Sequence, residues 1–165
     1  MQSEPPLEFF DSREIDDFLP LLRGLDELGD RFRLSMLHWC GYGQRARPLD
    51  YWRVQLVRQN GTTIGVCGLY RPPNESPEVV WLGWLGVQPQ YRRQGIASFI
   101  LTKMKNEAHA LGSHEIRVFT ESRNAAVQAF YAKNGFTPMG PAVTFAPGQG
   151  CDSDDLVLHY TLGGS

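Results

Sequence analysis

The fold is decided by the stretch Val87-Gln88-Pro89-Gln90-Tyr91-Arg92-Arg93-Gln94-Gly95-Ile96-Ala97-Ser98. It follows a nearly apolar run and opens a segment with helical periodicity, so it predicts a strand, a loop and a helix in succession. The first N–H groups of a helix lack partners within it, and the helix dipole is positive at that end. Two arginines and a glycine at this junction therefore favour binding of an anion such as a phosphate.

The flanking sequence predicts a mixed sheet covered by helices, with the order β-α-α-β-β-β-α-β-α-β-β. We expect strands at Leu7–Phe10, Tyr51–Gln59, Thr62–Tyr70, Val79–Val87, Ile116–Thr120, Phe136–Phe145 and Leu156–Leu162. We expect helical segments from Ile15, at Phe32–Trp39, at Gly95–Leu111 and at Asn124–Asn134. The fold class is α/β (an α+β mixed sheet), in a single domain of residues 1–165.

Short signals refine these elements. Asn60-Gly61 has the two residues that a type I′ hairpin turn needs. Asp11 and Glu14 have the spacing of a capping box before the first helix. Gly83 and Gly86 lie within a predicted buried strand, where glycine indicates a bulge or a close approach to the backbone.

Composition argues against several classes of protein. The 165 residues are 42% hydrophobic and 21% charged, with a net charge of −2, so the chain lacks the basic footprint of a nucleic-acid-binding protein. Its three cysteines are far apart and lack zinc-ligand spacing, so we expect neither a disulfide framework nor a metal site. The longest apolar run is far below the roughly 20 residues that span a bilayer, and no secretory signal pattern opens the sequence. We expect a cytoplasmic protein that does not bind membranes.

Two separated motifs resemble the GCN5-related N-acetyltransferase (GNAT) superfamily. Its acetyl-CoA signature is Arg or Gln, two residues, Gly, one residue, then Gly or Ala, here Arg92-x-x-Gly95-x-Ala97 after Val87-Gln88-Pro89. About thirty residues later the family has an Asn, an aromatic-Tyr pair and Gly-Phe, which here are Asn124, Phe130-Tyr131 and Gly135-Phe136. The resemblance implies the GNAT fold, with acetyl-CoA as the co-substrate.

The resemblance also implies which residues meet the donor. Small residues let the loop backbone approach the CoA pyrophosphate, so N–H groups from about Arg93 to Ser98 would point at its oxygens. The backbone of Leu85 and Val87 would pair with the pantetheine arm where the strand splays after Gly86, with Val87 as the oxyanion donor. Tyr131 would act as general acid toward the departing thiolate. The expected CoA-binding residues are Leu85, Val87, Arg92, Arg93, Gln94, Gly95, Ile96, Ala97, Ser98, Asn124 and Tyr131.

The general base and the acceptor stay open. Many relatives carry a Glu in the strand before the phosphate loop, but Val79–Val87 contains no acid. Glu78, Glu121, His38 or an ordered water are the candidates. Residues for an aromatic and acidic acceptor pocket exist, although a solvated acidic loop and ordinary core tryptophans explain them better: His38, Trp39, Tyr42, Trp81, Trp84, Asp152, Asp154 and Asp155.

Two functions follow from these features. The first is an acetyl-CoA-dependent N-acetyltransferase acting on a primary amine of a small molecule or peptide. The alternative is a non-catalytic CoA- or acyl-CoA-binding sensor or regulatory module, which the missing strand acid favours. We expect a monomer or a homodimer.

Overall fold

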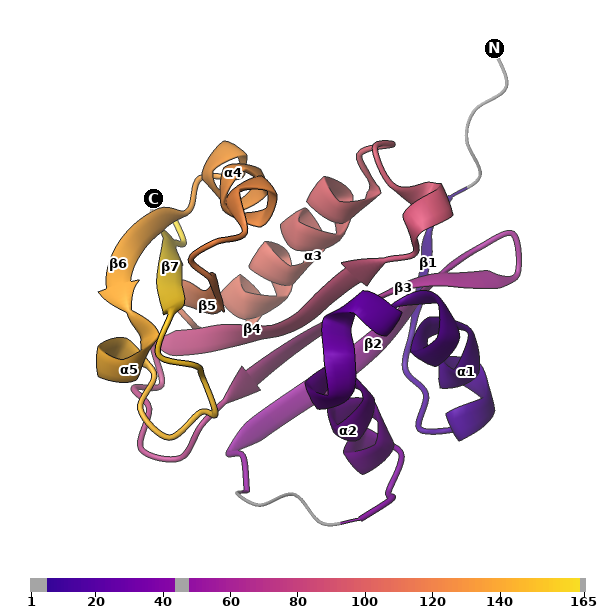
Figure 1. Cartoon of the computed structure of the whole chain (residues 1–165), viewed down its shortest axis with the longest axis horizontal. Coiled ribbons are helices and arrows are strands. Elements are labelled where there is room, and N and C mark those ends of the chain that lie inside the picture. Colours follow the sequence, from indigo (N-terminus) through magenta and orange to yellow (C-terminus); the bar gives the residue numbers. More distant parts are fainter. Residues whose placement is uncertain (1–5, 44–47, 164–165) are drawn as a thin grey trace.

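Seven strands form one mixed sheet in the order β1-β2-β3-β4-β5-β7-β6 (Figure 1). The structure, a computed structural model, describes residues 6–43 and 48–163. Only the β4–β5 pair is parallel. The strands are β1 (Glu8–Phe10), β2 (Tyr51–Gln59), β3 (Thr62–Arg71), β4 (Val79–Val87), β5 (Glu115–Glu121), β6 (Thr137–Pro141) and β7 (Asp155–Thr161).

Helices cover both faces of this sheet (Figure 1). Helices α3 (Ile96–Ala110) and α4 (Ala125–Lys133) pack on one face, where their apolar residues form a continuous core with β3, β4 and β5. Helices α1 (Ile15–Gly24) and α2 (Gly29–Trp39) pack on the opposite face. A short helix, α5 (Ala142–Phe145), packs with β7 and the first residues of β4. The remaining helical turns are η1 (Asp26–Leu28) and η2 (Pro89–Tyr91).

Local sequence accounts for the boundaries of these elements. Asn60 and Gly61 have φ angles of 52° and 76°, so the hairpin between β2 and β3 has the predicted primed turn. Helix α3 ends as predicted at Gly112, whose φ of 80° is the left-handed conformation common after helices. The predicted order of elements is confirmed, with α5 added. Among the described residues, no helix has the length and apolarity needed to cross a bilayer.

Two local predictions were wrong. Asp11 does not cap α1, because its carboxylate accepts two hydrogen bonds from Arg53 at 3.0 and 2.9 Å, while Ser12 Oγ accepts the N–H of Glu14. The predicted strand Phe136–Phe145 ends at Pro141, and residues 142–145 form α5. Proline has no N–H with which to continue a strand ladder, and its fixed φ suits the start of a helix.

Candidate functional site

Strands β4 and β5 pair only over their first three residues and then separate. Val79, Val80 and Trp81 pair with Glu115, Ile116 and Arg117. The register of β4 against β3 shifts between Leu82 and Leu85, which places a bulge at Gly83 and Trp84. A bulge bends and twists its strand, and the second half of β4 turns away from β5. The separation therefore begins after Trp81, and the prediction that it begins after Gly86 was wrong.

The separation leaves one edge of β4 open. The N–H of Gln88 donates to Ile64 O on β3 at 2.8 Å. Backbone groups of successive residues in a strand point to opposite edges, so the N–H groups of Leu85 and Val87 point away from β3 into the gap. The Leu85 side chain is half-buried and the Val87 side chain is buried, both against α3. These two residues therefore present backbone donors rather than side chains to the gap.

The loop after β4 forms a nest of unpaired backbone donors. Arg93 and Gly95 have left-handed φ angles of 61° and 77°, and Gly95 occupies the N-cap position of α3. No N–H from Arg93 to Ser98 donates to another described residue, and the first helical hydrogen bond is Phe99 N–H to Gly95 O. Six donors beside the positive end of a fifteen-residue helix make a strong anion site. Ile96 contributes only its backbone, because its side chain is buried in the core.

The two loop arginines lie in different surroundings. Arg92 Nε donates to Val87 O at 2.9 Å, and its guanidinium forms an ion pair with Glu27 of η1. Arg93 is exposed and makes no ion pair with any described residue. Arg93, with Gln94 beside it, is thus free to meet an anion at the nest.

Helix α4 brings the second motif to the same region. Asn124 caps this helix, since its Oδ1 accepts the Val127 N–H at 3.2 Å. Asn134 ties α4 to α3: its side chain donates to Ser98 Oγ at 3.4 Å, and its carbonyl accepts from Lys105 Nζ at 2.6 Å. This connection holds the second motif beside the helix that carries the nest.

Tyr131 is buried between Phe130 and Phe136, with both ring centroids 5.2 Å from its own. Burial raises the pKa of its hydroxyl well above the ordinary value near 10. The hydroxyl makes no hydrogen bond with another described residue. A tyrosine in this environment stays protonated at neutral pH and is available as a donor.

Comparison with known proteins decides the family. The profile of the acetyltransferase (GNAT) family matches residues 15–136, most of the chain. The chain belongs to this family. No curated protein matches its sequence at a significant level.

Solved structures of the GNAT family share the fold. A GNAT-family acetyltransferase from Staphylococcus aureus has a TM-score of 0.71 at 17% identity, over 96% of this chain and 100% of that one. The PaiA N-acetyltransferase of Thermoplasma acidophilum, solved with coenzyme A, has a TM-score of 0.66 at 15% identity, over 94% and 99%. The ribosomal-protein-S18-alanine N-acetyltransferase of Escherichia coli has a TM-score of 0.66 at 16% identity, over 97% and 96%. At these identities the likeness concerns the fold.

The three side-chain candidates for the general base lie in different parts of the fold. Glu78 precedes β4 and is roughly 23 Å from Leu85 at strand spacing, too far to reach an amine there. Phe32 of α2 lies beside Trp84 of β4, with 5.2 Å between the ring centroids. His38 is about 9 Å further along the same helix. Glu121 ends β5 at the same end of the sheet as Val87, because the two strands are parallel. Glu121 is therefore the best placed of the three.

The predicted acceptor residues separate into core and surface. Trp81 is fully buried and donates to Glu75 at 2.9 Å, and Trp39 is buried and donates to Ser12 O at 2.7 Å, so both belong to the core. Trp84 is half-buried on the α2 side of β4, and Tyr42 is exposed. Of the two tryptophans of β4, Trp81 is fully buried and Trp84 is partly exposed.

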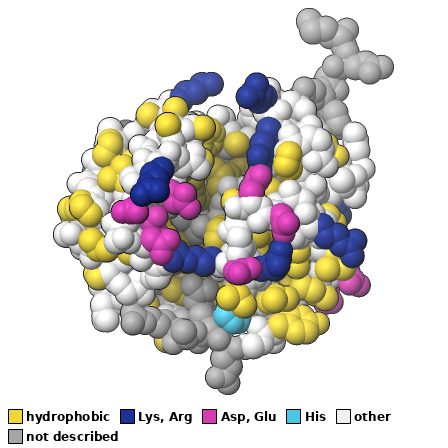
Figure 2. All heavy atoms as spheres, in the orientation of Figure 1, with side chains coloured by type: hydrophobic (Ala, Val, Ile, Leu, Met, Phe, Trp, Pro, Cys, Tyr) yellow, Lys and Arg dark blue, Asp and Glu magenta, His cyan; other side chains and the backbone are white. Residues whose placement is uncertain are grey.

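The predicted acceptor acids in the loop before β7 and at its first residue all have partners. Asp152 pairs with Arg31 of α2 at 2.9 Å, and Asp154 pairs with Arg123 at 3.8 Å. Asp155 is buried and accepts the Asp152 N–H at 2.8 Å. Figure 2 shows that this face of the molecule is hollowed, with apolar side chains inside and charged side chains of both signs around the rim.

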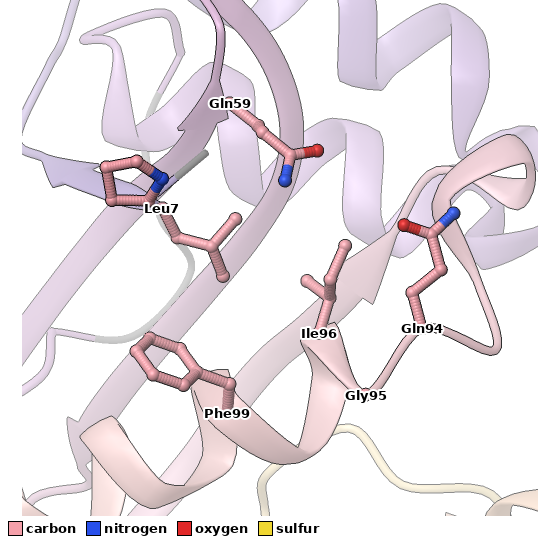
Figure 3. Close-up of a pocket in the computed structure, with 7 residues that line it drawn as sticks. Leu7, Gln59, Gln94, Gly95, Ile96 and Phe99 are labelled. Carbon is pink, nitrogen blue, oxygen red and sulfur yellow. The ribbon is translucent and has the colours of Figure 1, made fainter. Parts of the chain in front are cut away.

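A separate cavity lies away from this face. A cavity of about 390 Å³ opens between β1 and the start of α3, lined by Pro6, Leu7, Gln59, Gln94, Gly95, Ile96 and Phe99 (Figure 3). Phe99 faces β1 and stacks on Phe9, whereas Ser98 faces α4. The cavity is thus on the opposite flank of α3 from the second motif, and the gap between β4 and β5 is better placed for the chemistry. Among the described residues, no group of three or more His, Cys, Asp or Glu side chains has a metal-binding arrangement.

Proposed function

We propose that the protein is an acetyl-CoA-dependent N-acetyltransferase that modifies a primary amine of a small molecule or peptide. Family membership supports acetyl transfer. The observation that carries the proposal is the sequence of unpaired backbone donors that runs from the open edge of β4 at Leu85 and Val87 into the nest of residues 93–98. A ligand with an extended amide-containing arm and a pyrophosphate at one end matches this arrangement, and CoA has both.

In the proposed complex, the pyrophosphate accepts hydrogen bonds from the nest, and Arg93 adds a positive charge. The pantetheine arm lies along the open edge of β4 and pairs with its backbone, much as a strand would. The acetyl carbonyl then lies beside Val87, whose N–H stabilises the negative charge that develops on oxygen. Asn124 is placed at the start of α4 to contact the same ligand while it caps the helix.

Acetyl transfer begins when the amine nitrogen attacks the thioester carbon and a tetrahedral intermediate forms. The carbon–sulfur bond then breaks, and the sulfur leaves as a thiolate that needs a proton. We assign Tyr131 as the general acid that acts on this sulfur. Because its pKa is far above the roughly 8.5 of a thiol, Tyr131 stabilises the developing thiolate by donating a hydrogen bond and keeps its own proton. The released thiolate takes its proton from water as CoA leaves.

The amine must lose its own proton before it attacks. With an ordinary ammonium pKa near 10.4, fewer than roughly one amine in a thousand is neutral at pH 7. Strand β4 has no acid on its open edge, so we assign the first proton transfer to a water that passes the proton toward Glu121. In this proposal the water takes the role that the resemblance to the GNAT family assigns to a carboxylate on the strand.

The test is release of the CoA thiol from acetyl-CoA in the presence of a panel of primary amines and short peptides. We expect thiol release that depends on one acceptor class and that exceeds the hydrolysis measured without amine. The alternative is a CoA- or acyl-CoA-binding sensor, which the missing strand acid favours. Tight binding of acetyl-CoA without thiol release for every acceptor would support the sensor.

A further inference from the structure

The guanidinium of Arg92 connects the reacting end of β4 to the segment that follows α1. On one side its Nε donates to Val87 O at 2.9 Å. On the other side it pairs with the carboxylate of Glu27 in η1. Val87 is the residue whose N–H lies on the open edge, so Arg92 holds the peptide unit next to the proposed oxyanion donor.

The segment that carries Glu27 is itself fixed to β4. A Cβ at Gly86 would lie 2.9 Å from Leu25 Cδ1 and 3.2 Å from Leu28 Cδ1, so these leucines pack directly on the backbone of β4. A Cβ at Gly24 would overlap the buried Gln88 side chain, whose Nε2 donates to Thr63 O at 2.7 Å. The segment that carries Glu27 is therefore packed closely against β4 and can hold the Arg92 side chain in one orientation.

Charge distinguishes the two loop arginines. The carboxylate of Glu27 offsets the charge of Arg92, whereas Arg93 is exposed without an ion pair to any described residue. Both members of the Arg92–Glu27 pair are nearly half exposed, at 43% and 48% of their side-chain surface, and such pairs add little to stability. The geometry is thus better explained by orientation of Val87 than by stabilisation or phosphate binding.

We infer that Arg92 is a positioning residue, set by Glu27, that orients Val87 toward the thioester, and that Arg93 alone supplies the side-chain charge for the pyrophosphate. This inference rests on the proposed function. It changes the expectation from the sequence motif that both arginines neutralise phosphate. It also assigns a role to Glu27, which lies outside both motifs.

The test compares Arg92→Gln, Glu27→Gln, their double variant and the control Arg93→Gln. The Kd values of CoA and acetyl-CoA are measured by calorimetry at two salt concentrations, together with kcat and the KM of each substrate. Thermal unfolding establishes that each variant folds. Arg92→Lys is added because a lysine keeps the charge but lacks the planar fork that makes two directed contacts.

We expect Arg92→Gln and Glu27→Gln each to lower kcat by about 10- to 100-fold, the scale of a misplaced reacting group. Each should weaken acetyl-CoA binding relative to CoA, because only the thioester carbonyl meets Val87. The double variant should be no worse than either single one, and Arg92→Lys should not restore kcat. Arg93→Gln should instead weaken CoA and acetyl-CoA equally and reduce the salt dependence of binding.

The opposite pattern would overturn the inference. If Arg92 meets the phosphate, Arg92→Gln weakens CoA binding, Arg92→Lys restores it, and Glu27→Gln tightens it by freeing the arginine. If the wild-type protein releases no thiol with any amine, the proposed function fails. The ratio of the two Kd values still decides the role of Arg92 in that case, because it requires no turnover.

Discussion

Arg31 of α2 and Asp152 in the loop before β7 form an ion pair of 2.9 Å that joins segments 121 residues apart. The pair connects the first helices with the loop before the last strand, the two regions between which we propose that the acceptor binds. Both side chains are more than half exposed, so the pair contributes less than about 1 kcal/mol to stability. Its effect should therefore appear in acceptor binding.

We expect opposite effects from the two sides of this pair when the acceptor is a cationic amine. Asp152→Asn should raise the acceptor KM by about two- to fivefold, because it removes an attractive charge, and Arg31→Gln should lower it by a similar factor. The KM of acetyl-CoA should not change. Initial rates over a range of acceptor and salt concentrations give the measurement, and equal effects from both variants would contradict the charge argument.

Tyr131→Phe should lower kcat by about 100-fold, within the range for loss of a general acid, and should leave the Kd of acetyl-CoA nearly unchanged. The phenylalanine keeps the ring contacts with Phe130 and Phe136, so the free energy of unfolding should change little. Because burial raises the pKa of Tyr131, its hydroxyl should not cause a fall of kcat/KM below pH 10. Unchanged turnover in Tyr131→Phe would remove this residue from the mechanism.

Gly95→Ala and Gly112→Ala form a matched pair at the two ends of α3. Both glycines have left-handed φ angles, 77° and 80°, and a Cβ at either position meets no atom within 4 Å. Each alanine should therefore cost about 1 kcal/mol of unfolding free energy through backbone strain alone. Only Gly95→Ala should also weaken CoA binding, because only Gly95 shapes the nest. Calorimetry with CoA separates the two, and equal binding by both variants would argue against the nest.

Glu115 should make the protein more stable at neutral pH than in acid. Burial by itself raises the pKa of Glu115, but hydrogen bonds from Arg117 and His159 outweigh it, and the pKa lies below its ordinary value of 4.5. A carboxylate whose pKa is lowered by folding contributes to the free energy of unfolding at any pH above its ordinary value of 4.5. This contribution is lost as the pH falls through the lower pKa of the folded state. Melting temperatures between pH 3 and 7 should decline less steeply in Glu115→Gln, and an identical decline would contradict the assignment.

Local sequence accounts for much of this structure. The hairpin at Asn60 and Gly61, the end of α3 at Gly112 and the bounds of β4 follow from the residues at those positions. The nest was predictable because it depends on a glycine and a helix start that are adjacent in the chain. The error at Asp11 arose because a side chain that suits a helix cap found a stronger partner in Arg53, 42 residues away.

The features that the sequence did not reveal depend on long-range geometry. The point at which β4 leaves β5 follows from a bulge that becomes visible only when β4 is paired with β3. Glu27 lies 65 residues from Arg92, and no local pattern marks it as a partner. Motif spacing placed Arg92 at the phosphate loop, but only the fold shows where its side chain points.

The open half of β4 is a central strand that lacks a neighbour on one side. Unpaired strand edges at the rim of a sheet invite pairing with other chains and hence aggregation. This one lies between β3 and the diverging β5, so a whole strand from another molecule does not have free access to it. The open edge therefore keeps the unpaired hydrogen-bonding groups of an edge strand, but only a narrow, extended ligand with amide groups fits beside it.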